Sequence, residues 1–368
     1  MSGATAQRIF LAATGQNRGK TTVSLGMAAG IVADGHRLGF LKPVGQRFLV
    51  IDGTRADEDA VLMKAVFDLP DALNDMSPVT LPRHFTTDFV MGRVTDDLAS
   101  AVAAASDAVA RDKDVVLIEG TGHAGVGAVI GLSNAAVAAM LEAPVIIVSE
   151  GGVGRPIDEI VLNHALFERH GVRVVGAVVN KVNVDANPDL PEVLTQGLGQ
   201  HGIELLGCIP FSELLANPSL ELIVTHLSGK LLAGEARASA IIGRVAIGAM
   251  QADHAVPFLR DRTLLITPGD RVDMLEVALE AHRAGARRKE PLLTGIVLTG
   301  GFRPPPPTLE RLQSAGLFTY LVETDTYRTA QDVQDILVKT HPTDVEKIAT
   351  IIDLVGRSID PGALLARL

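Results

Sequence analysis

The sequence predicts an α/β protein in which a first domain, built on a parallel sheet, is followed by a second, smaller α/β domain. Short apolar runs alternate along the chain with longer segments whose apolar residues recur at helical spacing, as strand–helix–strand units require. Several short runs are apolar at consecutive positions, which is typical of strands covered on both faces. The chain has 368 residues, whereas a single hydrophobic core usually stops growing at about 250 residues. We therefore expect two domains.

The first domain is predicted to contain six strands joined by helices. The strands are expected over residues 8–13, 37–41, 114–118, 144–149, 173–179 and 204–209. One helix is expected after the first loop, where Val23, Met27 and Ile31 repeat at helical spacing, and another over residues 157–170. These helices would be the crossovers between parallel strands.

The alternation weakens after the sixth strand, in a mixed polar segment that contains Pro210 and Pro218. We therefore assign residues 1–215 to the first domain, 216–240 to a linker and 241–368 to the second domain. Within the second domain, strands are expected over residues 244–250, 263–267, 293–298 and 318–323, with helices over 272–284 and 343–355. The four prolines at positions 304–307 would suit a recognition segment of polyproline form, but a stiff surface loop is the preferred interpretation.

Composition and charge favour a folded protein that binds small molecules. Hydrophobic residues make up 47% of the chain and charged residues 21%, which predicts a well-formed core. The apolar stretch 135–148 is interrupted by Glu142 and Pro144 and is too short to cross a bilayer, and residues 1–10 lack the apolar segment of a signal peptide. We therefore expect a cytoplasmic protein without membrane contact. The net charge of −10 argues against nucleic acid as a partner.

A glycine-rich loop between the first strand and the first helix has the features of a phosphate-binding loop. Its residues include Thr14, Gly15, Gly19, Lys20, Thr21 and Thr22. Backbone amides exposed at the glycines and at the helix start would wrap the phosphates, Lys20 would meet the outer phosphates, and the Thr21 hydroxyl would hold Mg²⁺. The usual pattern has a glycine where this chain has Thr14, but Gly15 follows and allows the tight turn one residue later.

Polar side chains follow the ends of several other predicted strands. Lys42 follows the second strand, Glu119 the third, and Asn180 and Lys181 the fifth, while the fourth leads into the segment SEGGVGRP. In an open parallel sheet, ligands bind beyond the carboxyl ends of the strands. Each of these residues alone is typical of a solvated surface, but their coincidence predicts one shared crevice.

Two carboxylates are candidates to hold Mg²⁺ together with Thr21. Glu119 ends an apolar strand, and Asp59 lies in the segment DEDAVLM. Asp57 and Glu58 of the same segment are the alternatives to Asp59 and would lie on a solvated turn. Carboxylates are the hard oxygen ligands that Mg²⁺ prefers. The sequence therefore predicts a metal site made by Thr21, Asp59 and Glu119.

Charge also suggests roles for two residues at strand ends. Lys42 is positioned to neutralise a transferring phosphoryl group or an anionic substrate. Asn180 is a candidate to contact a base, and the guanine-reading pattern NKxD is incomplete, because Asn183 stands where that pattern has an aspartate. Adenine, and hence ATP, is the expected ligand.

Other catalytic patterns are absent from the sequence. The ten histidines and single cysteine lack the spacing of a zinc site. No G-x-S-x-G elbow occurs, so covalent catalysis by a serine is not expected.

Residues 5–212 resemble the dethiobiotin synthetase and cobyrinic acid amide synthase group of phosphate-loop proteins. The resemblance lies in the glycine-rich loop and in the segments FLKPVG, DEDAVLM, IEGTGHAGVGAVIGLSNAAVA and VVNKV. Within that group the chain is most similar to the amino-terminal region of long bacterial phosphate acetyltransferases. This resemblance implies a P-loop NTPase-like domain with ATP and Mg²⁺ as cofactors and a catalytic group of Lys20, Thr21, Lys42, Asp59 and Glu119. It also implies a homo-oligomer.

A second resemblance covers the other half of the chain. The segments TPGDRVDMLEVAL and IVLTGGF are similar to the DRTGG domain. The five residues that give this domain its name correspond here to Asp270, Arg271, Thr299, Gly300 and Gly301. Asp270 would cap the following helix. Arg271 would either pair with an anionic ligand or form a structural salt bridge.

Three functions follow from these observations. The first is an ATPase or ATP-dependent ligase that activates a carboxylate or carbamate by phosphoryl transfer. The second is a regulatory module that binds nucleotide and an anionic metabolite and acts on a partner enzyme of phosphate acetyltransferase type. The third is a purely structural loop that binds no ligand. It is disfavoured because glycines cost conformational entropy on folding, which a purely structural turn could avoid. The sequence leaves open which of Gln46, Arg47, His123 and Arg155 faces a substrate.

Overall fold

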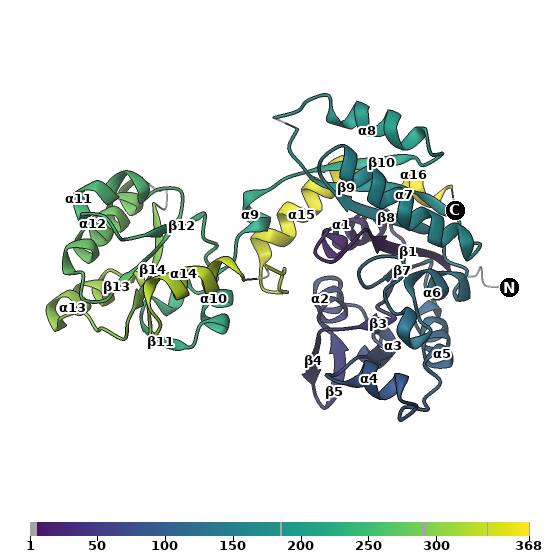
Figure 1. Ribbon diagram of the computed structural model, residues 1–368, viewed down its shortest axis with the longest axis horizontal. Coiled ribbons are helices and arrows are strands. Elements are labelled where there is room, and N and C mark those ends of the chain that lie inside the picture. Colours follow the sequence, from purple (N-terminus) through teal and green to yellow (C-terminus); the bar gives the residue numbers. More distant parts are fainter. Residues whose placement is uncertain (1–5, 185, 289–291, 337, 368) are drawn as a thin grey trace. The chain divides into compact units, whose positions relative to one another are not determined.

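The computed structural model describes residues 6–184, 186–288, 292–336 and 338–367 (Figure 1). The chain forms two compact units. The first consists of Met1–Phe211 with Val345–Leu368, and the second of Ser212–Asp344.

The first unit is built on a six-stranded sheet with the order β10-β9-β8-β1-β7-β2, and all its neighbouring strands are parallel (Figure 1). Its strands are β1 (Gln7–Ala13), β2 (Leu38–Leu41), β7 (Val115–Glu119), β8 (Val145–Glu150), β9 (Val174–Val182) and β10 (Leu205–Pro210). The predicted parallel sheet is confirmed. Its central strands are buried nearly throughout, as the uninterrupted apolar runs indicated.

Helices cover both faces of this sheet. They are α1 (Lys20–Ala33), α2 (Glu58–Phe67), α3 (Leu73–Met76), α4 (Phe85–Val90), α5 (Leu98–Ala110), η1 (Ala128–Ile130), α6 (Asn134–Met140), α7 (Gly154–Arg169) and α8 (Leu190–Gly199). Helix α1 packs on β1 and β7, α5 on β2, and α7 on β8 and β9. Between β2 and α5 the chain adds two small strand pairs that the sequence did not predict. These are β3 (Val44–Gly45) with β6 (Val79–Thr80) and β4 (Phe48–Ile51) with β5 (Thr54–Asp57).

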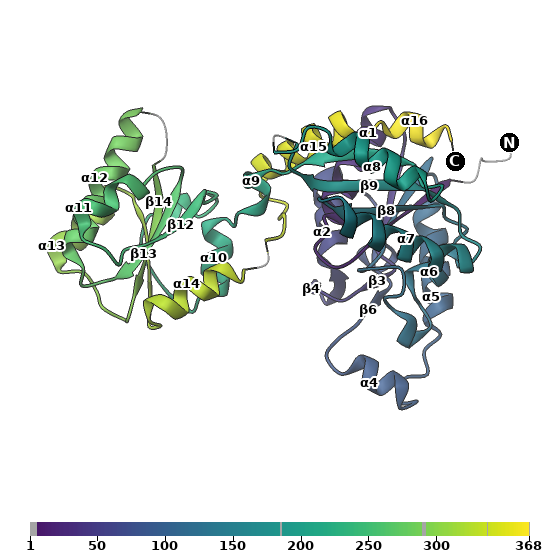
Figure 2. The ribbon, with the colours of Figure 1, turned by 45° about the horizontal axis from the view of Figure 1, so that its top comes forward.

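The last helices of the chain, α15 (Val345–Ser358) and α16 (Pro361–Leu365), belong to the first unit and pack on α1 (Figures 1 and 2). Two glycines of α1 allow this close approach. A Cβ added at Gly26 would overlap the side chain of Val355, and one added at Gly30 would lie 2.6 Å from Pro361 Cγ. The sequence placed these residues in the second domain. Helical spacing predicts that a helix forms, but it does not say which sheet the helix covers.

The second unit contains a five-stranded sheet with the order β11-β15-β14-β13-β12. Its strands are β11 (Gly229–Ala233), β12 (Arg244–Ile247), β13 (Thr263–Pro268), β14 (Leu293–Thr299) and β15 (Phe318–Val322). Strand β11 pairs antiparallel with β15, and the other pairs are parallel. Residues 216–240, expected as a linker, therefore contribute an edge strand to this unit. Because β11 has no fully buried residue, its alternation is too weak to be seen in the sequence.

Two apolar clusters cover the two faces of this second sheet. The helices of this unit are α9 (Glu213–Ala216), α10 (Leu220–His226), η2 (Glu235–Arg237), α11 (Ala252–Ala255), η3 (Val256–Phe258), α12 (Val272–Arg288), α13 (Pro306–Ser314) and α14 (Thr326–Gln334). Leu265 packs in the cluster with α12, whereas Leu264 and Ile266 pack in the cluster with α10 and α14. Pro306 and Pro307 begin α13, so the expected proline loop is partly helical, as suits proline in a first turn. No described helix is long and apolar enough to span a membrane.

Candidate functional site

The loop after β1 leads directly into the N-terminus of α1. Gly19 precedes α1 with a left-handed φ of +90°, a conformation that favours glycine. A Cβ at Gly19 would also overlap the amide nitrogen of Asn180. Lys20, which is 8% exposed, and Thr21 then form the start of α1, followed by the half-buried Thr22. The loop therefore presents a helix N-terminus, where unpaired N–H groups and the helix dipole favour an anion.

Thr14, which replaces the usual glycine, ties the loop to two neighbouring elements. Its buried hydroxyl donates to Glu159 Oε2 of α7 at 2.8 Å and lies 3.1 Å from Ser149 Oγ of β8. A glycine could make neither contact. The departure from the usual loop pattern is therefore an anchor that fits this loop to its surroundings.

An ion-pair network also holds the loop, and the sequence did not predict it. The Arg18 guanidinium pairs with Glu150 and with Glu159 Oε1, the latter at 3.4 Å. Lys181 Nζ donates to Glu150 Oε2 and to the backbone oxygen of Asn17, both at 3.0 Å. The available signal was that Glu150 ends β8, the strand beside β1, and that Lys181 lies near the end of β9, the next strand in the sheet.

A buried cluster of opposite charges lies beside the start of α1. Lys42 follows β2, Glu119 ends β7 and Asp59 lies in the first turn of α2. Lys42 Nζ is 2.5 Å from Asp59 Oδ2 and 3.0 Å from Glu119 Oε1. All three residues are buried. Because β2 and β7 are parallel neighbours, their ends bring Lys42 and Glu119 together as predicted.

Two hydroxyls of α1 complete this cluster. Thr21 Oγ1 lies 3.1 Å from both Asp59 Oδ1 and Glu119 Oε1 and donates its single proton to one of them, and Ser24 Oγ donates to Glu119 Oε2 at 2.6 Å. Sequence reasoning missed Ser24, although it lies one helical turn after Thr21. Asp57, an alternative to Asp59, is instead the N-cap of α2 and accepts from Asp59 N at 3.0 Å.

The pKa values of the cluster are shifted in directions that follow from burial and charge. Burial raises the pKa of Glu119, and the nearby charge of Asp59 adds to this, against the opposing effect of Lys42. Burial opposes charge on Lys42, but Asp59 and Glu119 outweigh it and raise the pKa of Lys42. Lys42 is therefore held as an ammonium ion.

The donor set of this cluster fits Mg²⁺. Asp59 and Glu119 offer carboxylate oxygens and Thr21 a hydroxyl oxygen, all of the hard type that Mg²⁺ takes. The Thr21 oxygen lies 3.1 Å from both carboxylates. The three predicted metal ligands are thus side by side.

Asn180 supports the phosphate loop in this structure. Its side chain is buried, and Nδ2 donates to the backbone oxygen of Arg18 at 3.3 Å. A contact of Asn180 with a base stays a prediction.

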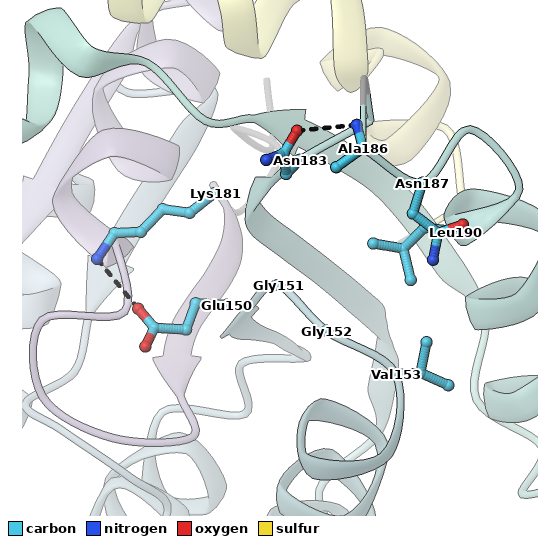
Figure 3. Close-up of a pocket in the computed structure, with 9 residues that line it drawn as sticks. All are labelled: Glu150, Gly151, Gly152, Val153, Lys181, Asn183, Ala186, Asn187 and Leu190. Carbon is cyan, nitrogen blue, oxygen red and sulfur yellow. Dashed lines mark hydrogen bonds and ion pairs between the residues drawn. The ribbon is translucent and has the colours of Figure 1, made fainter.

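A pocket of about 560 Å³ opens next to the loop, where β8 and β9 end (Figure 3). Its lining residues are Glu150, Gly151, Gly152, Val153, Lys181, Asn183, Ala186, Asn187 and Leu190. The Glu150–Lys181 ion pair lies on one side, while Val153 and Leu190 provide an apolar part on the other (Figure 3). Asn183 Oδ1 accepts from Ala186 N at 3.1 Å. Its amide oxygen is therefore already engaged.

The residues left open as substrate contacts have local partners. Gln46 Oε1 accepts from Gln16 of the loop at 3.4 Å, and His123 Nδ1 accepts from Gly125 N at 3.2 Å. Arg155 pairs with Glu159 at 2.7 Å. The backbone oxygen of Arg47 accepts from Glu58 N at 3.1 Å.

The five candidates in the second unit lie in two neighbouring turns. Arg271 pairs with Asp273 at 2.8 Å and donates to the backbone oxygen of Met250 at 3.0 Å. It thus forms the structural contact that the sequence offered as one alternative. The Asp270 side chain makes no hydrogen bond to any residue that the structure describes.

The second of these turns follows β14. The hydroxyls of Thr299 and Thr326 are hydrogen-bonded at 2.8 Å. Gly300 and Gly301 follow with left-handed φ values of +77° and +71°. The turns meet where Gly269 N donates to the Thr299 backbone oxygen at 3.4 Å. These residues shape the carboxyl end of the second sheet.

Comparison with known proteins gives a match for each unit. Residues 7–219 match the family described as AAA domain, and residues 222–336 match the DRTGG domain.

Two curated relatives, both named phosphate acetyltransferase, are similar along almost the whole chain. The one from Synechocystis sp. is 26% identical over 367 residues, which cover 97% of this chain and 51% of the relative. The one from Nitrosomonas europaea is 27% identical over 372 residues, with the same shares. The chain spans about half the length of the curated relatives it matches. Among solved structures, cobyrinic acid a,c-diamide synthase from Mycobacterium smegmatis, with bound ADP and magnesium, aligns with 56% of this chain and 88% of its own at 16% identity and a TM-score of 0.38.

Proposed function

The chain belongs to the AAA domain family over residues 7–219, and from this premise we propose that its first unit binds ATP with Mg²⁺ and transfers the terminal phosphoryl group. The acceptor would be a carboxylate or carbamate, as the resemblance to the synthetases implies. Water would serve as acceptor in a simple ATPase.

One observation carries this proposal: the cluster beside the phosphate loop combines the groups that phosphoryl transfer requires. Thr21, Asp59 and Glu119 form an oxygen-rich corner, and Lys42 adds a buried ammonium within 3.0 Å of both carboxylates. Catalysis of phosphoryl transfer depends on placed positive charge and on positioning rather than on covalent chemistry. A loop that only held a nucleotide would not need this second group of charges.

The residues would divide the work as follows. Backbone amides at the start of α1 and Lys20 would hold the phosphates, since both favour anions at a helix N-terminus. Thr21, Asp59 and Glu119 would hold Mg²⁺, which supplies positive charge to the phosphate oxygens. Lys42 would stabilise the charge that develops on the transferred group.

The pocket of Figure 3 supports adenine rather than guanine as the base. Guanine recognition by the NKxD pattern uses a carboxylate, and Asn183 stands at that position with its amide oxygen bound to Ala186 N. The pocket's own carboxylate, Glu150, already pairs with Lys181 and Arg18. An adenine ring could pack against Val153 and Leu190 without any free carboxylate.

The direct test is Mg²⁺-dependent release of ADP from ATP by the wild-type chain and by Lys20→Ala. A panel of dicarboxylates, amino acids and acetyl phosphate would be added to each. We expect turnover that Lys20→Ala abolishes and that one class of acceptor raises. That acceptor would identify the substrate class.

A second candidate function is a nucleotide-sensing module that acts on a partner enzyme. It is favoured by one finding: residues 222–336 match the DRTGG domain, and this region is included in the similarity to relatives named phosphate acetyltransferase. In this case ATP would bind but would not be consumed with any member of the panel.

A further inference from the structure

All four carboxylate oxygens of the buried cluster already accept hydrogen bonds. Asp59 Oδ1 accepts from Thr21 at 3.1 Å and Asp59 Oδ2 from Lys42 at 2.5 Å. Glu119 Oε1 accepts from Lys42 at 3.0 Å, and Glu119 Oε2 accepts from Ser24 at 2.6 Å. A metal ion that bridged Asp59 Oδ2 and Glu119 Oε1 would have to take the place of the Lys42 ammonium, which donates to both oxygens.

Lys42 is the donor that competes with a metal most directly. Its ammonium nitrogen contacts one oxygen of Asp59 and one of Glu119, and its side chain is 5% exposed. Mg²⁺ binds oxygen at about 2.1 Å, so an ion that bridged the same two oxygens would touch the ammonium. Like charges at that separation repel strongly where water is excluded.

We infer that Lys42 occupies the cation position of this site when no nucleotide is bound, and that Lys42 and Mg²⁺ exchange there when the nucleotide arrives. The inference rests on the proposed function, because the phosphates supply the new anionic partner that Lys42 needs. Without them, Mg²⁺ would force a buried ammonium to give up its partners, which is strongly unfavourable. Mg²⁺ alone should therefore bind poorly, whereas Mg²⁺ with nucleotide should bind well.

Thermal unfolding of the full chain without nucleotide tests this exchange. For the wild type we expect no change in the unfolding midpoint of the first unit when millimolar Mg²⁺ is added at constant ionic strength. Lys42→Met removes the ammonium that pairs with both carboxylates, so its midpoint should be lower. Mg²⁺ should restore this midpoint by about 5 °C or more, because an ion that binds only the folded state stabilises it.

Lys113→Met is the matched control. Lys113 Nζ pairs with Asp71 at 2.9 Å, and the two side chains are 9% and 12% exposed. The variant also loses a largely buried ammonium, but no second carboxylate lies beside Asp71 among the described ion pairs. Its midpoint should fall and should not recover with Mg²⁺.

Manganese binding to the wild type, followed by electron paramagnetic resonance, gives a second readout that does not depend on the variant's folding. The wild type without nucleotide should bind no Mn²⁺ at this site at millimolar concentration, because Lys42 and Mn²⁺ would compete for the same two oxygens. Tight binding of Mn²⁺ to the nucleotide-free wild type, or failure of Mg²⁺ to restore Lys42→Met, would overturn the exchange.

The two proposals fail in different ways. If a non-hydrolysable ATP analogue does not bind but Mg²⁺ restores Lys42→Met, the proposed function fails and the cation position of Lys42 stands. If the analogue binds and Lys42→Met is not restored, the exchange fails and the proposed function stands.

Discussion

Thr14 shows how a single side chain can adapt a loop to its fold. Its hydroxyl is the link from the phosphate loop to Glu159 and Ser149. Thr14→Val keeps the shape but removes a hydrogen-bond partner of the buried Ser149 and of the half-buried Glu159, so we expect the first unit to lose about 1–2 kcal/mol of unfolding free energy. Thr14→Ser keeps the hydroxyl and should lose much less. Denaturant unfolding of both variants checks this, and equal losses would show that the hydroxyl does not matter.

Two separate constraints, the backbone conformation and the space around the Cα, favour glycine at position 19. Its φ of +90° disfavours a side chain, and a Cβ there would also overlap Asn180. We expect Gly19→Ala to abolish binding of a fluorescent ATP analogue. Adding Asn180→Gly removes the overlap but not the strained φ, which itself costs about 1–2 kcal/mol. Gly19→Ala should also lower the free energy of unfolding, and the double variant should recover only part of that loss in denaturant unfolding. Full recovery would contradict a role for φ.

The acid sensitivity of the loop anchor follows from Glu159. Burial opposes its charge, but hydrogen bonds from Arg155 and Thr14 and the charge of Arg18 lower the pKa of Glu159. A carboxyl whose folded pKa is lowered stabilises the protein above its unfolded pKa of about 4.3 and loses this as pH falls through the folded value. The stability difference between wild type and Glu159→Gln should be at most about 1 kcal/mol at neutral pH. It should vanish in acid, whereas a difference that stays constant with pH would contradict this role.

The residues of the site could be predicted where topology alone brings them together. Lys42 and Glu119 end neighbouring parallel strands, so their meeting follows from the order of the sheet. The partners of Arg18 could not be predicted, because two acidic residues from β8 and α7 reach it only through the side-chain directions of the folded state. Ser24 was missed for a similar reason, since its contact depends on the rotation of α1.

The elements themselves show where periodicity succeeds and where it fails. Strands with continuous apolar runs, such as β7 and β8, lie within about two residues of their predicted bounds. Strand β11 was missed because an edge strand with partly exposed residues carries little pattern. The helix over residues 345–358 was predicted as an element, but its contact with α1 depends on Gly26 and Gly30, which only the structure brings opposite it.

The packing of α15 on α1 can be tested with two glycines that should respond in opposite ways. Glycine to alanine in an open helix stabilises by about 0.5–1 kcal/mol. Gly356 in α15 has open space around it, so Gly356→Ala should stabilise the chain. Gly26→Ala would press against Val355 and should destabilise by about 1–3 kcal/mol. Combining it with Val355→Ala should recover part of this loss in a double-mutant cycle by denaturant unfolding. Stabilisation by Gly26→Ala would show that α15 does not pack there.

At the scale of the whole molecule, the first unit is made from two distant segments of sequence, while the second is continuous. The second unit contains both of its core clusters within residues 212–344. We therefore expect the fragment 212–344 to unfold cooperatively by itself. The fragment 1–211 should be less stable than the first unit of the full chain, because it lacks the helices that cover α1. Calorimetry of both fragments checks this, and native stability of 1–211 alone would contradict the observed division.

The homo-oligomer stays a prediction that sedimentation of the full chain can test. The sequence resemblance implies pairing of the first unit, and no residue described above depends on it.

The central claim, that the first unit binds ATP with Mg²⁺ at its phosphate loop, is tested most directly by calorimetric titration with a non-hydrolysable ATP analogue. The account predicts Mg²⁺-dependent binding to the wild type, much weaker binding of the matching GTP analogue, and no binding to Lys20→Ala. Equal binding to wild type and Lys20→Ala, or no binding to the wild type, would contradict it.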